Sequence, residues 1–142
     1  MLGRDKYPQD YIDECRSNID ASVSAYENVV TTAKGRHDAS LDAALESFEP
    51  FFYNNMVVVL EGYFVHRLRA VEKKDGNPLN EVRVLCNSIM QSGSTLAPDT
   101  TITLNPAKSV LKLEIGDEIR LSGEDFARLS RAFFAELERK FL

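Results

Sequence analysis

The amino-acid sequence predicts a mainly α-helical protein of the α+β class, with about five helices in a bundle. A small antiparallel β-hairpin, or a three-stranded meander, is expected before the last helix. Apolar residues recur at three- and four-residue steps through most of the chain, as on the buried face of a helix. Residues typical of helix starts and ends separate these stretches. Only the region 101–121 alternates apolar and polar residues, as a strand does.

Length and composition indicate a single domain spanning residues 1–142. Hydrophobic residues make up 44% of the chain and charged residues 27%, which is typical of a folded protein. A chain of 142 residues is long enough to bury a core. The β insert is too small to fold alone, so we assign it to the same domain as the helices.

The first helix is predicted over residues 8–34. Pro8 suits the first helical position, and Gly35 suits the position after the last turn. Between them the apolar positions form one stripe: Ile12, Cys15, Ile19, Val23, Tyr26 and Val30.

Two further helices are predicted over 39–48 and 50–73, separated at Pro50, which cannot donate a backbone hydrogen bond. The second of these contains the most apolar stretch of the chain. Its run of β-branched residues, Val57 to Val59, would also suit a strand. The length of the stretch favours a helix instead, because ordinary strands are shorter.

A fourth helix is predicted over 78–90, with Asn77 as its cap and Pro78 at its first position. The β insert is expected over about 101–121, with a turn at Gly116. Ser122 and Asp125 have the spacing of a capping box, which predicts the start of the last helix, 122–141.

The net charge of the chain argues against nucleic-acid binding. It is -5 at pH 7, with a pI near 5.1, and a negative protein surface repels phosphates. No apolar run is long enough for a membrane span, and residues 1–8 lack the apolar core of a signal peptide. Cys15 and Cys86 fall at core positions of separate helices and are expected to be reduced. We therefore expect a cytoplasmic protein that contacts neither nucleic acid nor membrane.

The chain has few residues suited to catalysis or to metal binding. Its only histidines are His37 and His66, and they do not form a HxxxH or ExxH pair. A di-iron bundle would need two ExxH pairs, and phosphate-binding loops and nucleophile elbows have glycine patterns that this sequence lacks. We predict no catalytic residues, no metal and no cofactor.

Arg67 is the strongest candidate for a binding residue. It follows Leu60 and Phe64 at helical steps, which places a charge in an apolar arc. A buried arginine must be paired, and Glu81 or Glu14 is the expected partner. The preferred interpretation is a structural ion pair. The alternative is a site for an anionic ligand, formed by Arg67, His66, Arg69, Tyr63 and Asn55.

A second apolar stripe predicts a homodimer. Phe51, Val58 and Val65 follow one another at seven-residue spacing, on a different side of the central helix from Leu60 and Phe64. A helix that is apolar on two sides is either central in a bundle or shared between subunits. The sequence thus favours a non-enzymatic protein that acts through protein contacts; the alternative is a binding protein or small enzyme for an anionic small molecule.

The sequence also resembles a family of small uncharacterised bacterial proteins of actinobacterial type. The resemblance lies in residues 63–69 (YFVHRLR) and 74–83 (KDGNPLNEVR), and continues through 109–113 and 133–137. It implies a bacterial, cytoplasmic origin, and it supplies no catalytic residue.

Overall fold

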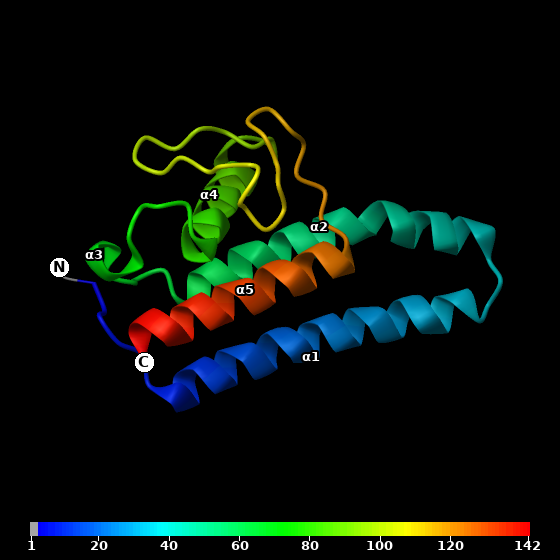
Figure 1. The fold of residues 1–142 in the computed structure, drawn as a ribbon. Helices are drawn as coiled ribbons and strands as arrows, with labels where there is room; N and C mark the ends of the chain where they lie inside the picture. Colours follow the sequence, from blue (N-terminus) through cyan, green and yellow to red (C-terminus); the bar gives the residue numbers. More distant parts are fainter. Residues whose placement is uncertain (1–2) are drawn as a thin grey trace.

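The computed structural model describes residues 3–142; Met1 and Leu2 of the predicted domain lie outside the described residues. It confirms a mainly helical protein with five helices. The two longest, α1 (Gln9–Lys34) and α2 (Ala39–Tyr63), form an antiparallel hairpin. Helix α5 (Gly123–Phe141) lies along α2, and α4 (Pro78–Gln91) packs on both of them, on the side away from α1 (Figure 1). The short α3 (Arg69–Glu72) lies beside the C-terminal end of α5.

The predicted break at Pro50 does not occur, because α2 runs through this residue without interruption. Proline removes one backbone hydrogen bond from a helix interior, and packing must offset that loss. The stacked rings of Tyr26 and Phe52, 4.3 Å apart between centroids, hold α2 against α1 directly after Pro50. Tertiary contacts therefore override the local signal, and the predicted helices 39–48 and 50–73 begin as one helix.

The central helix ends at Tyr63, ten residues before the predicted end at residue 73. The chain then turns, and its backbone pairs with the N-terminal segment. The amide of Arg4 donates to the His66 carbonyl at 2.7 Å, and the amide of Leu68 donates to the Arg4 carbonyl at 2.8 Å. These bonds replace the helical hydrogen bonds that residues 66 and 68 would otherwise make.

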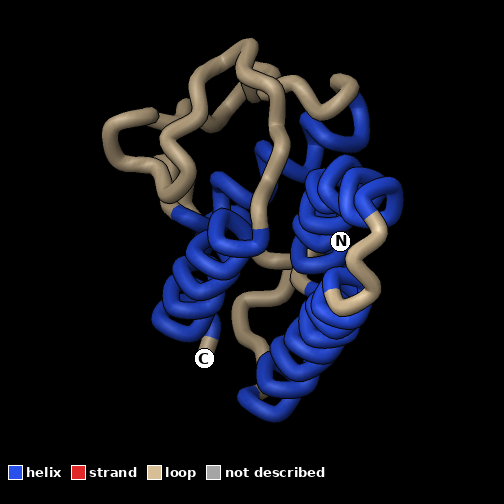
Figure 2. Tube along the Cα trace, turned by 90° about the vertical axis from the view of Figure 1, so that its right-hand side faces the viewer, coloured by secondary structure: helices blue, strands red, loops and turns tan. Residues whose placement is uncertain are grey.

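The predicted β insert is wrong: between residues 3 and 142 the structure contains no strand, only isolated bridges (Figure 2). Side chains satisfy the backbone of this loop in place of a partner strand. The carboxylate of Glu81 accepts from the amides of Val110 and Leu111, at 2.8 and 3.0 Å. The alternation in sequence instead reflects side chains that bury themselves singly in the core: Ile102, Ile119 and Leu121.

The core lies where α1, α4 and α5 pack against α2, and its largest fully buried side chains include Phe64, Phe133 and Phe141. The capping box at Ser122 and Asp125 is present as predicted. Both cysteines are buried thiols. The packing of the helices around this core places the end of α2 next to the start of α4 and the end of α5.

Asn54 on α2 binds the backbone of the long loop between α4 and α5, and this contact can be tested by mutation. Its amide donates to the Ile119 carbonyl at 2.6 Å, and its oxygen accepts from the Leu121 amide at 3.1 Å. Asn54→Ala leaves both backbone groups unpaired, so we expect a loss of about 2 kcal/mol or more in the free energy of unfolding. Asn55→Ala is the matched control, because the neighbouring Asn55 is exposed. Equal urea denaturation midpoints for the two variants would contradict this role.

Candidate functional site

Arg67 is completely buried, and every nitrogen of its guanidinium group donates to a protein oxygen. Nη1 lies 2.9 Å from Glu61 and 3.0 Å from the Phe64 carbonyl. Nε lies 3.1 Å from Glu72, and Nη2 lies 3.2 Å from the Leu79 carbonyl. The preferred sequence interpretation, a structural ion pair, is therefore confirmed.

A second arginine completes the arrangement. Arg83 binds Glu72 through two nitrogens and lies 3.7 Å from Glu61. Asn80 donates to Oε2 of Glu72 at 2.8 Å, an oxygen that also accepts from Nε of Arg83. We call Glu61, Arg67, Glu72, Asn80 and Arg83 the Arg67 cluster. Its two cations and two anions balance, which limits the free-energy cost of burying them.

The Arg67 cluster joins four consecutive parts of the chain. Glu61 lies in the last turn of α2, Arg67 in the following turn, Glu72 at the end of α3, and Asn80 and Arg83 in α4. Lys140 of α5 donates to the Glu72 carbonyl at 2.8 Å. Because its members come from α2, the following turn, α3 and α4, the cluster fixes how α3 and α4 meet α2.

The two glutamates of the cluster differ in their pKa values. Burial alone would raise the pKa of Glu72, but hydrogen bonds and charge from Arg83 and Arg67 lower it to about 2. For Glu61, burial outweighs the attraction of Arg67 and Arg83, so its pKa is raised. The difference follows from the hydrogen bonds: Glu72 accepts from three side chains, Arg67, Arg83 and Asn80, and Glu61 accepts from Arg67.

The expected partners of Arg67, Glu81 and Glu14, are both wrong. Glu81 is buried, but its carboxylate accepts from the loop amides at residues 110 and 111. Glu14 is exposed on α1. These partners were wrongly predicted because α2 was expected to continue to residue 73. Because α2 stops at Tyr63, Arg67 turns back toward Glu61 instead of continuing along a helical face.

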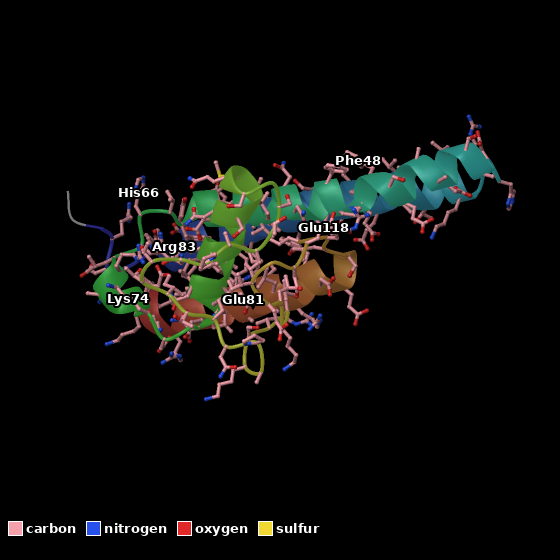
Figure 3. The ribbon with its side chains drawn as sticks, turned by 90° about the horizontal axis from the view of Figure 1, so that it is seen from above. Phe48, His66, Lys74, Glu81, Arg83 and Glu118 are labelled. Atoms are coloured by element: carbon pink, nitrogen blue, oxygen red, sulfur yellow. The ribbon has the colours of Figure 1, made fainter. Side chains whose placement is uncertain are left out.

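The five residues of the predicted anion site do not come together. Tyr63 and His66 line a hollow beside Arg4, Tyr7 and Tyr11, and His66 is exposed on the outside of the molecule (Figure 3). Arg69 is exposed and lies 3.5 Å from the Thr101 hydroxyl. Asn55 lines a different hollow, near Phe51 and Arg120. Arg67 is buried and each of its guanidinium nitrogens already has a protein partner, so this set lacks its central cation.

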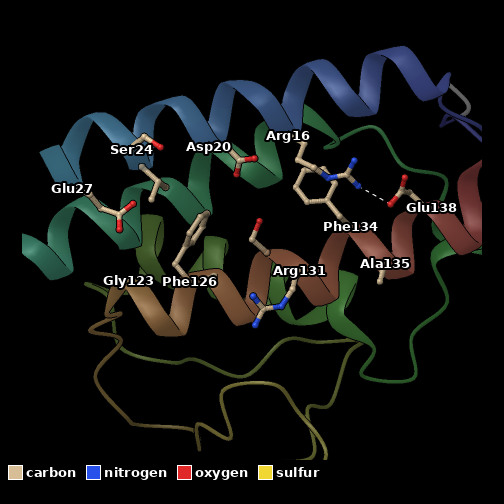
Figure 4. Close-up of a pocket in the computed structure, with 13 residues that line it drawn as sticks. Arg16, Asp20, Ser24, Glu27, Gly123, Phe126, Arg131, Phe134, Ala135 and Glu138 are labelled. Atoms are coloured by element: carbon tan, nitrogen blue, oxygen red, sulfur yellow. Dashed lines mark hydrogen bonds and ion pairs between the residues drawn. The ribbon is translucent and has the colours of Figure 1, made fainter.

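Two surfaces are open to a partner, and the predicted dimer stripe identified the first of them only in part, through Phe51 and Val58. One is an exposed apolar face of α2, around Phe48 and Phe51. The other is a groove of about 680 Å³ between α1 and α5 (Figure 4). The spacing of Phe48, Phe51 and Asn55 could have indicated the first, whereas the second requires knowledge of where α5 begins.

Comparison with known proteins adds no function: family models, curated protein sequences and solved structures all fail to match this chain. Within residues 3–142, no helix is long and apolar enough to cross a bilayer, and no group of three or more His, Cys, Asp or Glu could hold a metal ion. The bacterial, cytoplasmic origin implied by the resemblance remains a prediction.

Removing one anion tests the structural role of the Arg67 cluster. Glu72→Gln leaves Arg67 and Arg83 with one carboxylate between them, and we expect a loss of about 3–5 kcal/mol in the free energy of unfolding. Glu118→Gln is the control, because Glu118 pairs with Arg120 on the exposed surface. Its expected effect is within about 0.5 kcal/mol. Comparable urea unfolding curves for the two variants would show that the cluster is dispensable.

The lowered pKa of Glu72 also predicts a pH dependence. The ordinary value of 4.5 falls to about 2 on folding, so ionised Glu72 stabilises the protein above pH 4.5. This contribution is lost as the pH falls from 4.5 toward 2. The raised pKa values of Glu61 and Glu81 act in the opposite direction. The causes of the Glu81 shift are present in both proteins, whereas the charge of Glu72 contributes to the raised pKa of Glu61 and is absent from the variant.

The stability difference between the wild type and Glu72→Gln should therefore shrink as the pH is lowered through this range, because protonated Glu72 resembles glutamine. Urea unfolding at a series of pH values measures it. A difference that stays constant from neutral pH to pH 2 would refute the assignment to Glu72.

Proposed function

We propose that this chain is a non-enzymatic protein-interaction protein that acts as a homodimer. The buried charges of the Arg67 cluster are paired with one another, so the groups available to a partner lie on the outer faces of the helices. The observation that carries the proposal is Phe51, which is 71% exposed in the middle of an uncharged face of α2.

This face, which we call the open face, is the side of α2 that α1, α4 and α5 do not cover. At its edge, Ile89 of α4 lines a hollow together with Phe51 and Asn55. A helix places residues at three- and four-residue steps on one side. The residues of α2 that share this side are Ala44, Ser47, Phe48, Phe51, Asn55, Val58 and Gly62.

The absence of charge on the open face favours a second copy of the chain as its partner. A two-fold contact places the same patch of each subunit against the other, so a charge near the axis would face its own copy. The open face carries no charged residue from Ala44 to Gly62. The nearest charges at its edge, Glu118 and Arg120, pair with each other at 3.3 Å.

Gly62 suits such a contact. A Cβ atom built there would meet nothing within 4 Å, so packing within the subunit does not require a glycine. Glycine costs about 1 kcal/mol relative to alanine in a helix interior. A small residue on an apolar helical face lets the backbone of a second helix approach closely, and this role would account for it.

Of the predicted dimer stripe, Phe51 and Val65 are exposed and Val58 is half-buried. Val65 lies beyond the end of α2, so it does not share a helical face with Phe51 and Val58. Phe48, 49% exposed, takes its place on the open face. In Figure 3, Phe48 lies on the outer side of α2, away from the α4 and α5 ribbons.

Light scattering after size exclusion tests the proposal. At micromolar concentration the wild type is expected at twice the 16.0 kDa mass of the chain. Phe51→Glu should give the mass of a single chain, because it places two charges against each other at the centre of the contact. The control is Leu142→Glu, which changes an exposed apolar residue after α5. A wild-type monomer, or a Phe51→Glu dimer, would contradict the proposal.

A further inference from the structure

We infer that a groove along α1 binds an amphipathic helix of another protein, one with an apolar stripe flanked by lysine and arginine. This partner is distinct from the second copy proposed above and uses a different side of α2. The α1 groove is lined by α1 and α5 in its first part and by α1 and α2 in its second.

The two parts of the α1 groove lie on one side of α1. Residues of α1 that line it follow one another at three- and four-residue steps: Arg16, Asp20, Val23, Glu27, Val30 and Lys34. At about 1.5 Å per residue this stripe is about 27 Å long. A partner helix of about 18 residues would match that length.

The groove is open because α5 is shorter than the hairpin beside it. Helix α5 begins at Gly123, where an added Cβ would lie 2.9 Å from the hydroxyl of Tyr53. We call residues 26–34 and 39–48 the arm, the part of α1 and α2 beyond this point. No third helix covers the arm (Figure 1). An amphipathic helix pair normally buries its apolar seam against another element.

Apolar side chains line both parts of the groove. Figure 4 shows Phe126 and Phe134 of α5 below the α1 side chains in the first part. Small side chains at Gly123, Ala127 and Ala135 keep this part wide. In the arm, a hollow of about 410 Å³ has a floor of Tyr26, Val30 and Leu45. Docked helices bury their apolar positions in such a groove.

The rims of the groove are acidic. Arg16 pairs with Glu138 at 2.6 Å, so these two charges cancel. Among the other lining residues the cations are Lys34 and Arg131, and the anions are Asp20, Glu27, Asp42, Glu46 and Glu49. Five carboxylates against two cations favour a basic partner.

Two details support a negative potential inside the groove. One oxygen of Asp42 is buried and accepts no hydrogen bond within the described part of the chain. Burial raises the pKa of Tyr53, and Glu27 and Glu49, which line the groove, add to this rise and bring the pKa to about 12. A lysine or arginine of a docked helix would offset the charge of these carboxylates.

The same charges argue against a second copy in this groove. Two copies placed groove to groove would bring five carboxylates toward five others, with two cations on each side. Like charges in contact disfavour association. The acidic rims also disfavour a nucleic acid or an anionic membrane surface.

A designed peptide tests the inference. The probe is a fluorescent amphipathic helix of about 18 residues, with leucine at three- and four-residue steps and lysine elsewhere. A control probe has glutamate in place of lysine. Binding to the full-length chain is followed by fluorescence anisotropy at low and high salt. The lysine helix should bind at least about tenfold more tightly than the glutamate helix, and salt should weaken it.

Variants of the chain locate the binding. The double variant Glu27→Lys, Glu46→Lys reverses two exposed charges in the groove and should weaken the lysine helix at least about tenfold. Glu118→Lys reverses an exposed charge outside the groove and should not. Phe51→Glu should bind as the wild type does, even as a monomer, which separates this inference from the homodimer proposal. Circular dichroism confirms that each variant is folded.

Three results would overturn the inference. The first is equal binding of the two probes, and the second is an equal loss in the groove variant and in Glu118→Lys. The third is a wild-type homodimer that the groove variant alone converts to a monomer, which would place a second copy in the groove.

Discussion

The structure depends on the burial of one guanidinium group. Arg67 lies among the aromatic rings of the core, with Phe133 5.4 Å from its guanidinium carbon. There it can persist only if its hydrogen bonds and its charge are satisfied. Glu61, Glu72 and two carbonyl oxygens meet that demand, and each comes from a different point in the chain. The end of α2, the short α3 and the start of α4 are thereby held together at one end of the hairpin. Such a cluster specifies the arrangement of segments more than it adds to stability, because burying four charges costs nearly as much as pairing them returns.

The surfaces available to partners follow from the same geometry. The Arg67 cluster holds α4 against one end of α2, and α5 covers α2 only from Gly123 onward. One long side of α2 is left open and uncharged, and the seam between α1 and α2 is uncovered in the arm. These two surfaces differ in chemistry: the open face can meet itself, whereas the α1 groove carries an excess of carboxylates. A chain with both could join a copy of itself and a basic partner at once.

Much of the helical architecture could be predicted from the sequence, because stripes such as Ile12, Cys15 and Ile19, and caps such as Asn77 and Ser122, are local signals. The predictions that were wrong all depend on contacts between residues that are far apart in the sequence. Pro50 stays inside a helix because Tyr26 and Phe52 stack across the hairpin. Residues 101–121 form no strand because Glu81 and Asn54 bind their backbone from other helices. The burial of Arg67 was predictable from its apolar neighbours, but its partners were not, because the end of α2 is set by backbone pairing with Arg4.

The central claim is that this chain acts through its outer helical faces, with the open face of α2 joining two copies. Hydrogen–deuterium exchange, compared between dilute and concentrated protein, tests it most directly because it reports position as well as association. The account predicts that concentration adds protection in residues 44–62 of α2 and around Ile89, and leaves the exchange of α3 and of Asn80 and Arg83 in α4 unchanged. Exchange that is independent of concentration, or added protection confined to other segments, would contradict it.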